Sequence, residues 1–268
     1  MHDPLTTRPG NRVSGEKSAV DGNPFRSTKP VALFLDVDGT LLEIRERPDL
    51  VTVPPALLDI ISGVAQRLDG ALALVSGRSI ADIDHLLAPL RPPASGQHGS
   101  EMRLQHGGVV TPRSTEPIPF SLRRKIAEVA AAIPGVEVED KGQTVAVHYR
   151  AAPQVPDTLK ARIENLVANS GLELLLVHGR KVLEVRDARI SKGTAVHDFM
   201  QTPPFAGRLP IFVGDDVTDE DGFAAVESFG GTALPVGRVH SARRDTAFET
   251  PADVRAWLGA FSQIPGAM

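Results

Sequence analysis

Hydrophobic residues along the first third of the chain form unbroken runs that alternate with helical repeats. Residues 31–35 and 71–75 are wholly apolar, which is typical of strands buried on both faces of a parallel sheet. Residues 54–70 have helical spacing, with prolines at the start and a glycine at the end, and Ser79 opens a second helical segment that ends at Leu87. This order of elements predicts right-handed crossovers and a parallel sheet covered by helices.

The middle of the chain has a different pattern, in which each of two helical segments is followed by a hairpin. The first hairpin turns around residues 141–143, and the second around Gly179 and Arg180 as a two-residue loop. The predicted helices are 121–133 and 156–170, and the predicted strands are 135–140, 144–150, 172–178 and 181–186. We expect a small module of two helices on a four-stranded antiparallel sheet.

From Lys192 the first pattern returns. The chain shows a helix, a buried strand, a helix and a strand, and then a last helix with Thr250 as its cap and Pro251 in its first position. We therefore predict an α/β core with an inserted α+β cap over the carboxyl edge of the sheet, where open α/β sheets bind ligands. The predicted division is 1–29 as a disordered tail, 30–117 and 188–268 as the core, and 118–187 as the cap.

Composition excludes several classes of protein. The 268 residues include no cysteine, so disulfides, thiolate metal sites and a cysteine nucleophile are excluded. The net charge is −4 and there is no basic block, so we expect no nucleic-acid partner and no membrane-surface partner. No apolar run has the roughly 20 residues of a membrane span, and the N-terminus lacks a signal-peptide core. We expect a monomer in the cytoplasm.

Polar residues gather where the predicted core strands end. Asp36, Asp38, Ser76, Asp215 and Asp216 all follow apolar strands, whose carboxyl ends meet at one edge if the strands are parallel. Carboxylates brought together in this way repel one another unless a positive charge lies between them. An all-oxygen cluster favours a hard ion, with Mg²⁺ first and Mn²⁺ or Ca²⁺ after it.

The same edge also has groups that suit a phosphate. Mg²⁺ in proteins is commonly shared with a phosphate oxygen, and Thr40, Ser76 and Lys192 supply hydroxyl and cationic partners for such a group. Gly39 and Gly77 allow backbone N–H groups to turn toward an anion. Lys192 begins a predicted helix, whose dipole adds to the attraction.

Asp36 and Asp38 have different predicted roles. Because Gly39 breaks the strand, Asp38 can leave the sheet and lie beside Asp36. A metal-bound Asp36 stays ionised and can attack phosphorus, while Asp38 can donate a proton to a leaving alkoxide and later accept one from water. An Asp-x-Asp pair is also a common turn, and the other motifs are each weak alone. Their joint occurrence in this order favours catalysis.

These motifs resemble those of the haloacid dehalogenase superfamily of phosphatases: DVDGTL from Asp36, Ser76 of VSGR, Lys192 of SKG, and GDDVTDED from Gly214. Within it, the chain is most similar to the trehalose-6-phosphate phosphatases. That likeness rests on SGQHGSE (95–101), EDKGQTVAVHYR (139–150), HGRKVLEVR (178–186) and GDDVTDEDGF (214–223), and with the motifs it covers nearly all of residues 30–262.

The resemblance implies a role for each matching residue. Asp36 is the implied nucleophile and Asp38 the general acid/base. The implied Mg²⁺ ligands are Asp36, the backbone carbonyl of Asp38, and Asp215. The residues implied to bind the phosphoryl group are Thr40, Ser76 and Lys192, with Gly77 beside Ser76. The residues implied to hydrogen-bond the sugar that lacks the phosphate are Glu139, Lys141 and Glu184 of the cap. The implied partner is a small molecule, trehalose 6-phosphate.

Several alternatives stay open. Charges at a hairpin such as Glu139 and Lys141 are also found simply solvated, and His98 suits either a substrate contact or a satisfied loop histidine. His148 alternates with apolar residues and is predicted to be structural. The chain departs from the family pattern at Asp187, where proline is frequent, and at Arg189, where residues are commonly small or apolar, so hinge geometry is the least determined feature.

Two other functions compete with trehalose 6-phosphate hydrolysis. One keeps the chemistry and changes the substrate, to a sucrose or mannosylglycerate phosphate; the three cap residues favour trehalose instead. The other is a catalytically inactive regulatory domain, against which every catalytic position is filled.

Overall fold

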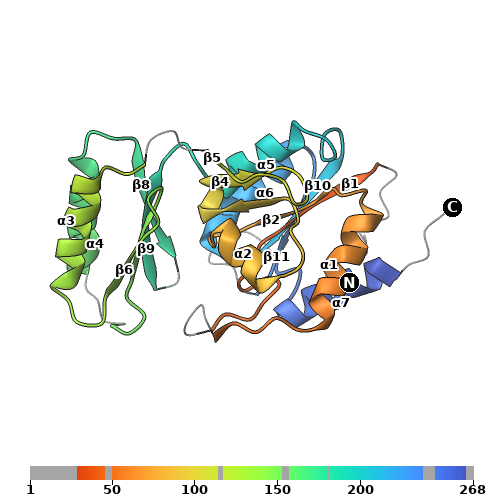
Figure 1. Ribbon diagram of the computed structural model, residues 1–268, viewed down its shortest axis with the longest axis horizontal. Helices are drawn as coiled ribbons and strands as arrows, with labels where there is room; N and C mark the ends of the chain where they lie inside the picture. Colours follow the sequence, from red (N-terminus) through yellow and green to blue (C-terminus); the bar gives the residue numbers. More distant parts are fainter. Residues whose placement is uncertain are drawn as a thin grey trace, which may run out of the picture.

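The computed structural model describes residues 29–45, 50–113, 117–152, 157–179, 181–237 and 245–263. The predicted tail lies outside these residues, apart from Lys29. Figure 1 shows two bodies side by side: an α/β core, and a smaller module built from the middle of the chain. Among the described residues, no helix is long and apolar enough to cross a bilayer.

Within the described residues, the core sheet has seven strands. Its order is β11 (Thr232–Pro235), β10 (Leu209–Gly214), β1 (Val31–Leu35), β2 (Leu72–Val75), β3 (Ala94–Gly96), β4 (Glu101–Arg103) and β5 (Thr111–Pro112). The pairs from β11 to β3 are parallel, and those of β4 and β5 are antiparallel. Strands β1 and β2 are buried throughout, which confirms the predicted parallel sheet.

Helices cover this sheet, and two short 3₁₀ turns lie at its carboxyl edge. The helices are α1 (Ala56–Arg67), α2 (Ile80–Leu86), α5 (Lys192–Met200), α6 (Glu220–Ser228) and α7 (Pro251–Gln263); the turns are η3 (Gln97–Gly99) and η4 (Val217–Asp219). Helix α1 packs on α7, and α5 packs on α6 (Figure 1). The Ser79 side chain caps α2, and Thr250 caps the turn that opens α7, both as predicted.

The inserted module is a four-stranded antiparallel sheet in the order β6 (Glu137–Asp140), β7 (Val145–His148), β9 (Val182–Asp187) and β8 (Leu174–Gly179). Helices α3 (Phe120–Ala131) and α4 (Asp157–Ala168) lie on the side of this sheet away from the core (Figure 1). The module has a hydrophobic cluster of its own, separate from that of the core. The predicted fold class, an α/β core with an α+β cap, is confirmed.

The second hairpin differs from the prediction by one residue. Gly179 still pairs with Val182, so the connection comprises residues 180 and 181 and not 179 and 180. Lys181 has a φ of 65°, a left-handed backbone conformation of the kind that tight hairpin turns require. Arg180 and Pro156, at which a loop and a helix were predicted, lie outside the described residues.

The two departures from the family pattern at the hinge bind each other. The Arg189 guanidinium donates to both carboxylate oxygens of Asp187, at 2.9 and 2.7 Å, and the Arg189 backbone N–H donates to the same carboxylate at 2.9 Å. The hydrogen bond from Arg189 holds the pKa of Asp187 below its usual range. A local ion pair therefore links Asp187 and Arg189 at the predicted junction of cap and core.

Candidate active site

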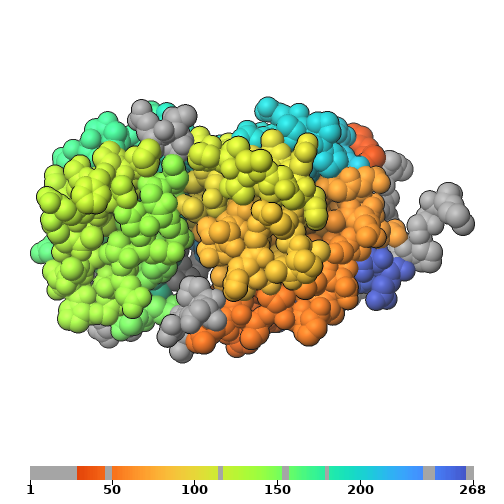
Figure 2. All heavy atoms as spheres, in the orientation of Figure 1, coloured from red at the N-terminus to blue at the C-terminus, as the bar shows by residue number. Residues whose placement is uncertain are grey.

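A cavity of about 620 Å³ lies between the cap sheet and the carboxyl edge of the core sheet. In the space-filling view the two bodies meet along a furrow (Figure 2). The predicted site residues that line the cavity are Asp36, Asp38, Ser76, Gly77, Glu139, Lys141, Glu184 and Lys192. The fold thus brings together residues predicted to bind phosphate and residues predicted to bind sugar.

A buried ion cluster forms the core side of this cavity. The Lys192 ammonium donates to Asp36 Oδ1 at 2.8 Å and to Asp219 Oδ1 at 2.6 Å. Ser191 caps α5 through a capping box, which fixes Lys192 in the first turn of that helix. Burial works to lower the pKa of Lys192, but Asp219 and Asp36 outweigh it and raise that pKa, so the lysine stays charged.

Asp219 is a site residue that sequence reasoning missed. Its Oδ2 accepts the backbone N–H groups of Asp215 and Asp216, each at 2.9 Å, and its side chain is inaccessible to solvent. The signal was present in GDDVTDED, four residues after Asp215. The turn η4 brings the Asp219 side chain back to the end of β10, and we did not predict that turn from the sequence.

Three carboxylates of this cluster could hold a metal ion. Asp36, Asp215 and Asp219 each offer an oxygen, and these oxygens lie within 4.8 Å of one another. Burial raises the pKa of Asp36 well above its ordinary value, Asp219 and Asp215 add to this, and Lys192 opposes it. Burial and Asp219 likewise raise the pKa of Asp215 to about 7. Crowded carboxylates with raised pKa values are a favourable environment for a cation.

Thr40 and Asp215 are predicted site residues that do not line the cavity. Thr40 is fully buried and donates to Asp215 Oδ1 at 3.5 Å. Gly39 has a φ of 84°, and a Cβ at this position would lie 2.1 Å from Asp215 Oδ2. Glycine is therefore required at position 39 for two reasons: the backbone is left-handed, and the Asp215 carboxylate occupies the space that a side chain would need.

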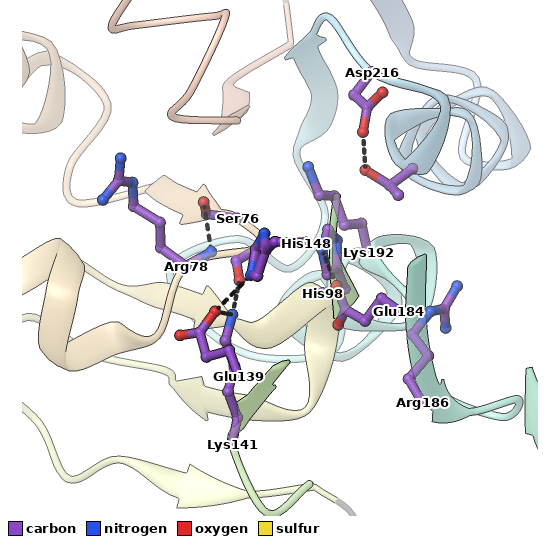
Figure 3. A network of polar contacts seen from close by, with 12 residues as sticks. Ser76, Arg78, His98, Glu139, Lys141, His148, Glu184, Arg186, Lys192 and Asp216 are labelled. Carbon is purple, nitrogen blue, oxygen red and sulfur yellow. Dashed lines mark hydrogen bonds and ion pairs between the residues drawn. The ribbon is translucent and has the colours of Figure 1, made fainter. Parts of the chain in front are cut away.

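Asp38 leaves the strand, as predicted, and meets an arginine that the sequence analysis did not single out. The Arg78 guanidinium donates to both oxygens of Asp38, at 2.5 and 2.7 Å. The backbone N–H of Arg78 also donates to Ser76 Oγ at 3.2 Å (Figure 3). Arg78 thus ties Asp38 to the loop that holds Ser76, and the signal for it was the arginine of VSGR.

From the cap, Glu139, Lys141 and His148 lie together at the cavity (Figure 3). His148 Nε2 lies 3.1 Å from Glu139 Oε2, and Lys141 Nζ lies 3.5 Å from the same oxygen and 3.5 Å from the carbonyl oxygen of Gly77. The hydrogen bond with His148 lowers the pKa of Glu139. His148, predicted to be structural, therefore lines the cavity and supports a candidate sugar ligand.

His98 and Glu184 form a pair across the cleft. His98 belongs to η3 in the core and Glu184 to β9 in the cap, and His98 Nε2 lies 2.9 Å from Glu184 Oε2. Both residues line the cavity beside Lys192 (Figure 3). The structure thus places His98 in the cavity lining, in contact with a residue of the cap.

Comparison with solved structures defines the class of fold. The C-terminal domain of C. albicans trehalose-6-phosphate phosphatase matches with a TM-score of 0.76 and 20% identity, covering 91% of this chain and 95% of that chain. A Bacteroides thetaiotaomicron phosphatase of the haloalkanoate dehalogenase superfamily matches with a TM-score of 0.62 and 18% identity, covering 87% and 95%. The chain therefore shares its fold with these two proteins.

Sequence comparison narrows the class to one family. The family model for trehalose-phosphatase matches residues 34–254. The chain is 43% identical to a probable trehalose-phosphate phosphatase of Sinorhizobium fredii and 41% identical to the trehalose-6-phosphate phosphatase of Escherichia coli K12, covering 77% of each chain in both cases. The chain belongs to the trehalose-phosphatase family.

Proposed function

We propose that this enzyme hydrolyses trehalose 6-phosphate to trehalose and phosphate, as the last step of trehalose biosynthesis. The observation that carries the proposal is one cavity that is lined both by Asp36, Asp38 and Lys192 of the core and by Glu139, Lys141 and Glu184 of the cap. The core residues suit a phosphoryl group. The cap residues suit the hydroxyl-rich sugar that remains when the phosphate lies against the core.

The proposed mechanism has two steps. An Asp36 oxygen attacks phosphorus and forms an aspartyl phosphate, while Asp38 donates its proton to the departing sugar oxygen. Asp38 then takes a proton from a water molecule that attacks the same phosphorus, and Asp36 is released with inorganic phosphate. Ser76, Gly77 and Lys192 are proposed to hold the phosphoryl oxygens during both steps. We also propose that Thr40 binds the phosphoryl group, as predicted. Its hydrogen bond to Asp215 gives it a second proposed role, to hold that carboxylate in place.

Mg²⁺ is the cofactor that we propose for the acidic cluster. The donors are all carboxylate oxygens, apart from the backbone carbonyl proposed for Asp38, and this is the chemistry that Mg²⁺ prefers. The proposed side-chain ligands are Asp36 and Asp215, to which we add Asp219 because the carboxylate oxygens of all three lie within 4.8 Å of one another. When bound, the ion would neutralise charge on the phosphoryl oxygens.

We propose the cap as residues 118–187 and the core as residues 30–117 and 188–268. The two separate hydrophobic clusters support this division. A cap that closes over bound substrate would exclude water from the aspartyl phosphate until the sugar departs. A monomeric state and a cytoplasmic location stay predictions.

Phosphate release over a panel of substrates tests the function. Trehalose 6-phosphate should be hydrolysed far faster than sucrose 6-phosphate, a mannosylglycerate phosphate or glucose 6-phosphate. Removing Mg²⁺ with a chelator should abolish the activity, and adding it back should restore it. A preference for another sugar phosphate would overturn the substrate, whereas no turnover of any phosphate would favour the inactive regulatory domain.

For Asp38→Asn we expect losses that depend on the leaving group. The variant keeps the backbone carbonyl but has no proton to donate, so a poor leaving group suffers most. The value of kcat on trehalose 6-phosphate should fall at least tenfold more than kcat on an activated aryl phosphate. Equal losses on the two substrates would show that Asp38 mainly shapes the site.

Alanine at Glu139, Lys141 or Glu184 should reduce kcat/KM on trehalose 6-phosphate about tenfold to a hundredfold, the loss of a hydrogen bond to a charged group. Hydrolysis of a small aryl phosphate should change much less, because that substrate does not reach the cap. Glu128→Ala, on the exposed face of helix α3 and outside the cavity lining, is the matched control. Equal losses on both substrates would mean that the three residues hold structure and not sugar.

A further inference from the structure

His98 lies in a loop that is fixed to the candidate phosphate-binding loop. Its backbone N–H donates to the carbonyl of Ser76 at 2.9 Å, and the N–H of Gln97 donates to the carbonyl of Arg78 at 2.8 Å. A Cβ on Gly77 would lie 2.5 Å from His98 Nε2, so the imidazole packs directly over the glycine. The ring is thus held in place by the same loop that presents Ser76.

Glu184 meets this ring with one oxygen and leaves the other free. Its Oε2 lies 2.9 Å from His98 Nε2, while Oε1 is buried and has no hydrogen-bond partner among the described residues. The Nδ1 atom of His98 is likewise buried and unpartnered within the described part of the chain. A buried carboxylate oxygen without a donor is unfavourable, so a substrate hydroxyl at this position would satisfy it.

Electrostatics keep Glu184 in the form that such a contact needs. Burial works to raise the pKa of Glu184, but His98 above all, with Lys141 and Arg186, outweighs burial and holds that pKa below its usual range. The carboxylate is therefore ionised and can only accept hydrogen bonds. A sugar hydroxyl can donate to it, and a charged acceptor makes that bond stronger than a neutral one.

We propose that His98 is the positioning residue of the sugar subsite: its imidazole holds Oε2 of Glu184 and directs Oε1 at a hydroxyl of the sugar. The proposal rests on the proposed function and deepens it. Because His98 belongs to the core and Glu184 to the cap, the bond is made only when the cap lies against the core. Sugar recognition is thereby linked to the closed cleft.

Kinetics of His98 variants on two substrates test this role. His98→Ala should lower kcat/KM on trehalose 6-phosphate about tenfold to a hundredfold. We expect less than a threefold change on a small aryl phosphate. His98→Gln places an amide N–H near the position of Nε2 and should recover most of the lost activity. His106→Ala, an exposed core histidine outside the cavity, is the matched control and should match the wild type.

A double-mutant cycle with Glu184→Ala asks whether His98 acts through Glu184. In the Glu184→Ala background, His98→Ala should cost less than a further threefold on the sugar phosphate, because the carboxylate that it positions is gone. Losses that multiply would overturn the proposal, and so would equal losses on the sugar and aryl substrates. If an amide at position 98 restores nothing while thermal stability is unchanged, the positioning role is also wrong.

The substrate preference of the wild-type enzyme distinguishes failure of this inference from failure of the proposed function. If wild-type enzyme prefers another sugar phosphate, the same cycle is run on that substrate, and non-additive losses would still support His98 as the positioning residue. If wild-type enzyme discriminates no sugar phosphate from the aryl phosphate, then there is no sugar subsite, and this inference fails together with the substrate assignment.

Discussion

Asp36→Asn should abolish phosphatase activity, with a loss of at least about 10⁴-fold on sugar and aryl phosphates alike. An amide cannot attack phosphorus, and both substrates need the same nucleophile. The fold should survive. Burial and neighbouring carboxylates disfavour the ionised form of Asp36, so a neutral amide relieves repulsion, and Lys192 keeps its bond to Asp219. Phosphate release and thermal melting of the metal-free protein measure the two effects.

Two results for Asp36→Asn would contradict this prediction. A variant that melts like the wild type and still turns over either substrate at more than about 1% of the wild-type rate would rule out Asp36 as the nucleophile. A variant that melts far below the wild type would mean that the Asp36 carboxylate supports the fold, contrary to the direction of its pKa shift.

Asp219→Ala is expected to have the second-largest effect, on stability and activity together. The change leaves the partly buried N–H groups of Asp215 and Asp216 without their acceptor, at up to about 1–3 kcal/mol for each, and removes one of two carboxylates bound to Lys192. Relief of repulsion within the cluster offsets part of this loss. We expect unfolding free energy to fall by about 2–4 kcal/mol and activity to fall at least a hundredfold.

Asp219→Asn separates the two effects. Its amide oxygen can still accept the two backbone N–H groups, so most of the stability should return. The missing charge should weaken binding at the proposed metal site and raise the Mg²⁺ concentration needed for activity. Denaturant unfolding and Mg²⁺ titration check the pair. An alanine variant as stable as the wild type would mean that η4 does not depend on this carboxylate.

Local sequence patterns predicted the framework of the site well. Asp36 and Asp38 follow β1, and Asp215 follows β10, at ends that periodicity alone locates. Lys192 lies at the start of α5, where a serine cap and helical spacing place it. Strands β3 to β5 were missed because their segments are short, rich in glycine and polar residues, and without an alternating pattern. β3 is a strand because β2 offers it an edge to pair with, and β4 and β5 then add in turn, β4 on β3 and β5 on β4.

What the sequence by itself determined is the set of groups at the carboxyl edge, since a buried parallel strand fixes where its polar end must lie. What only the tertiary structure decided is which of these groups touch. The Asp38–Arg78 and Glu184–His98 pairs join segments far apart in the chain. The second pair depends on how the cap packs against the core. Asp219 reaches the cluster through the turn η4, which local hydrogen bonds to the backbone of Asp215 and Asp216 support. Its bond with Lys192 forms only when the start of α5 lies against the end of β10, and a local sequence pattern does not show that contact.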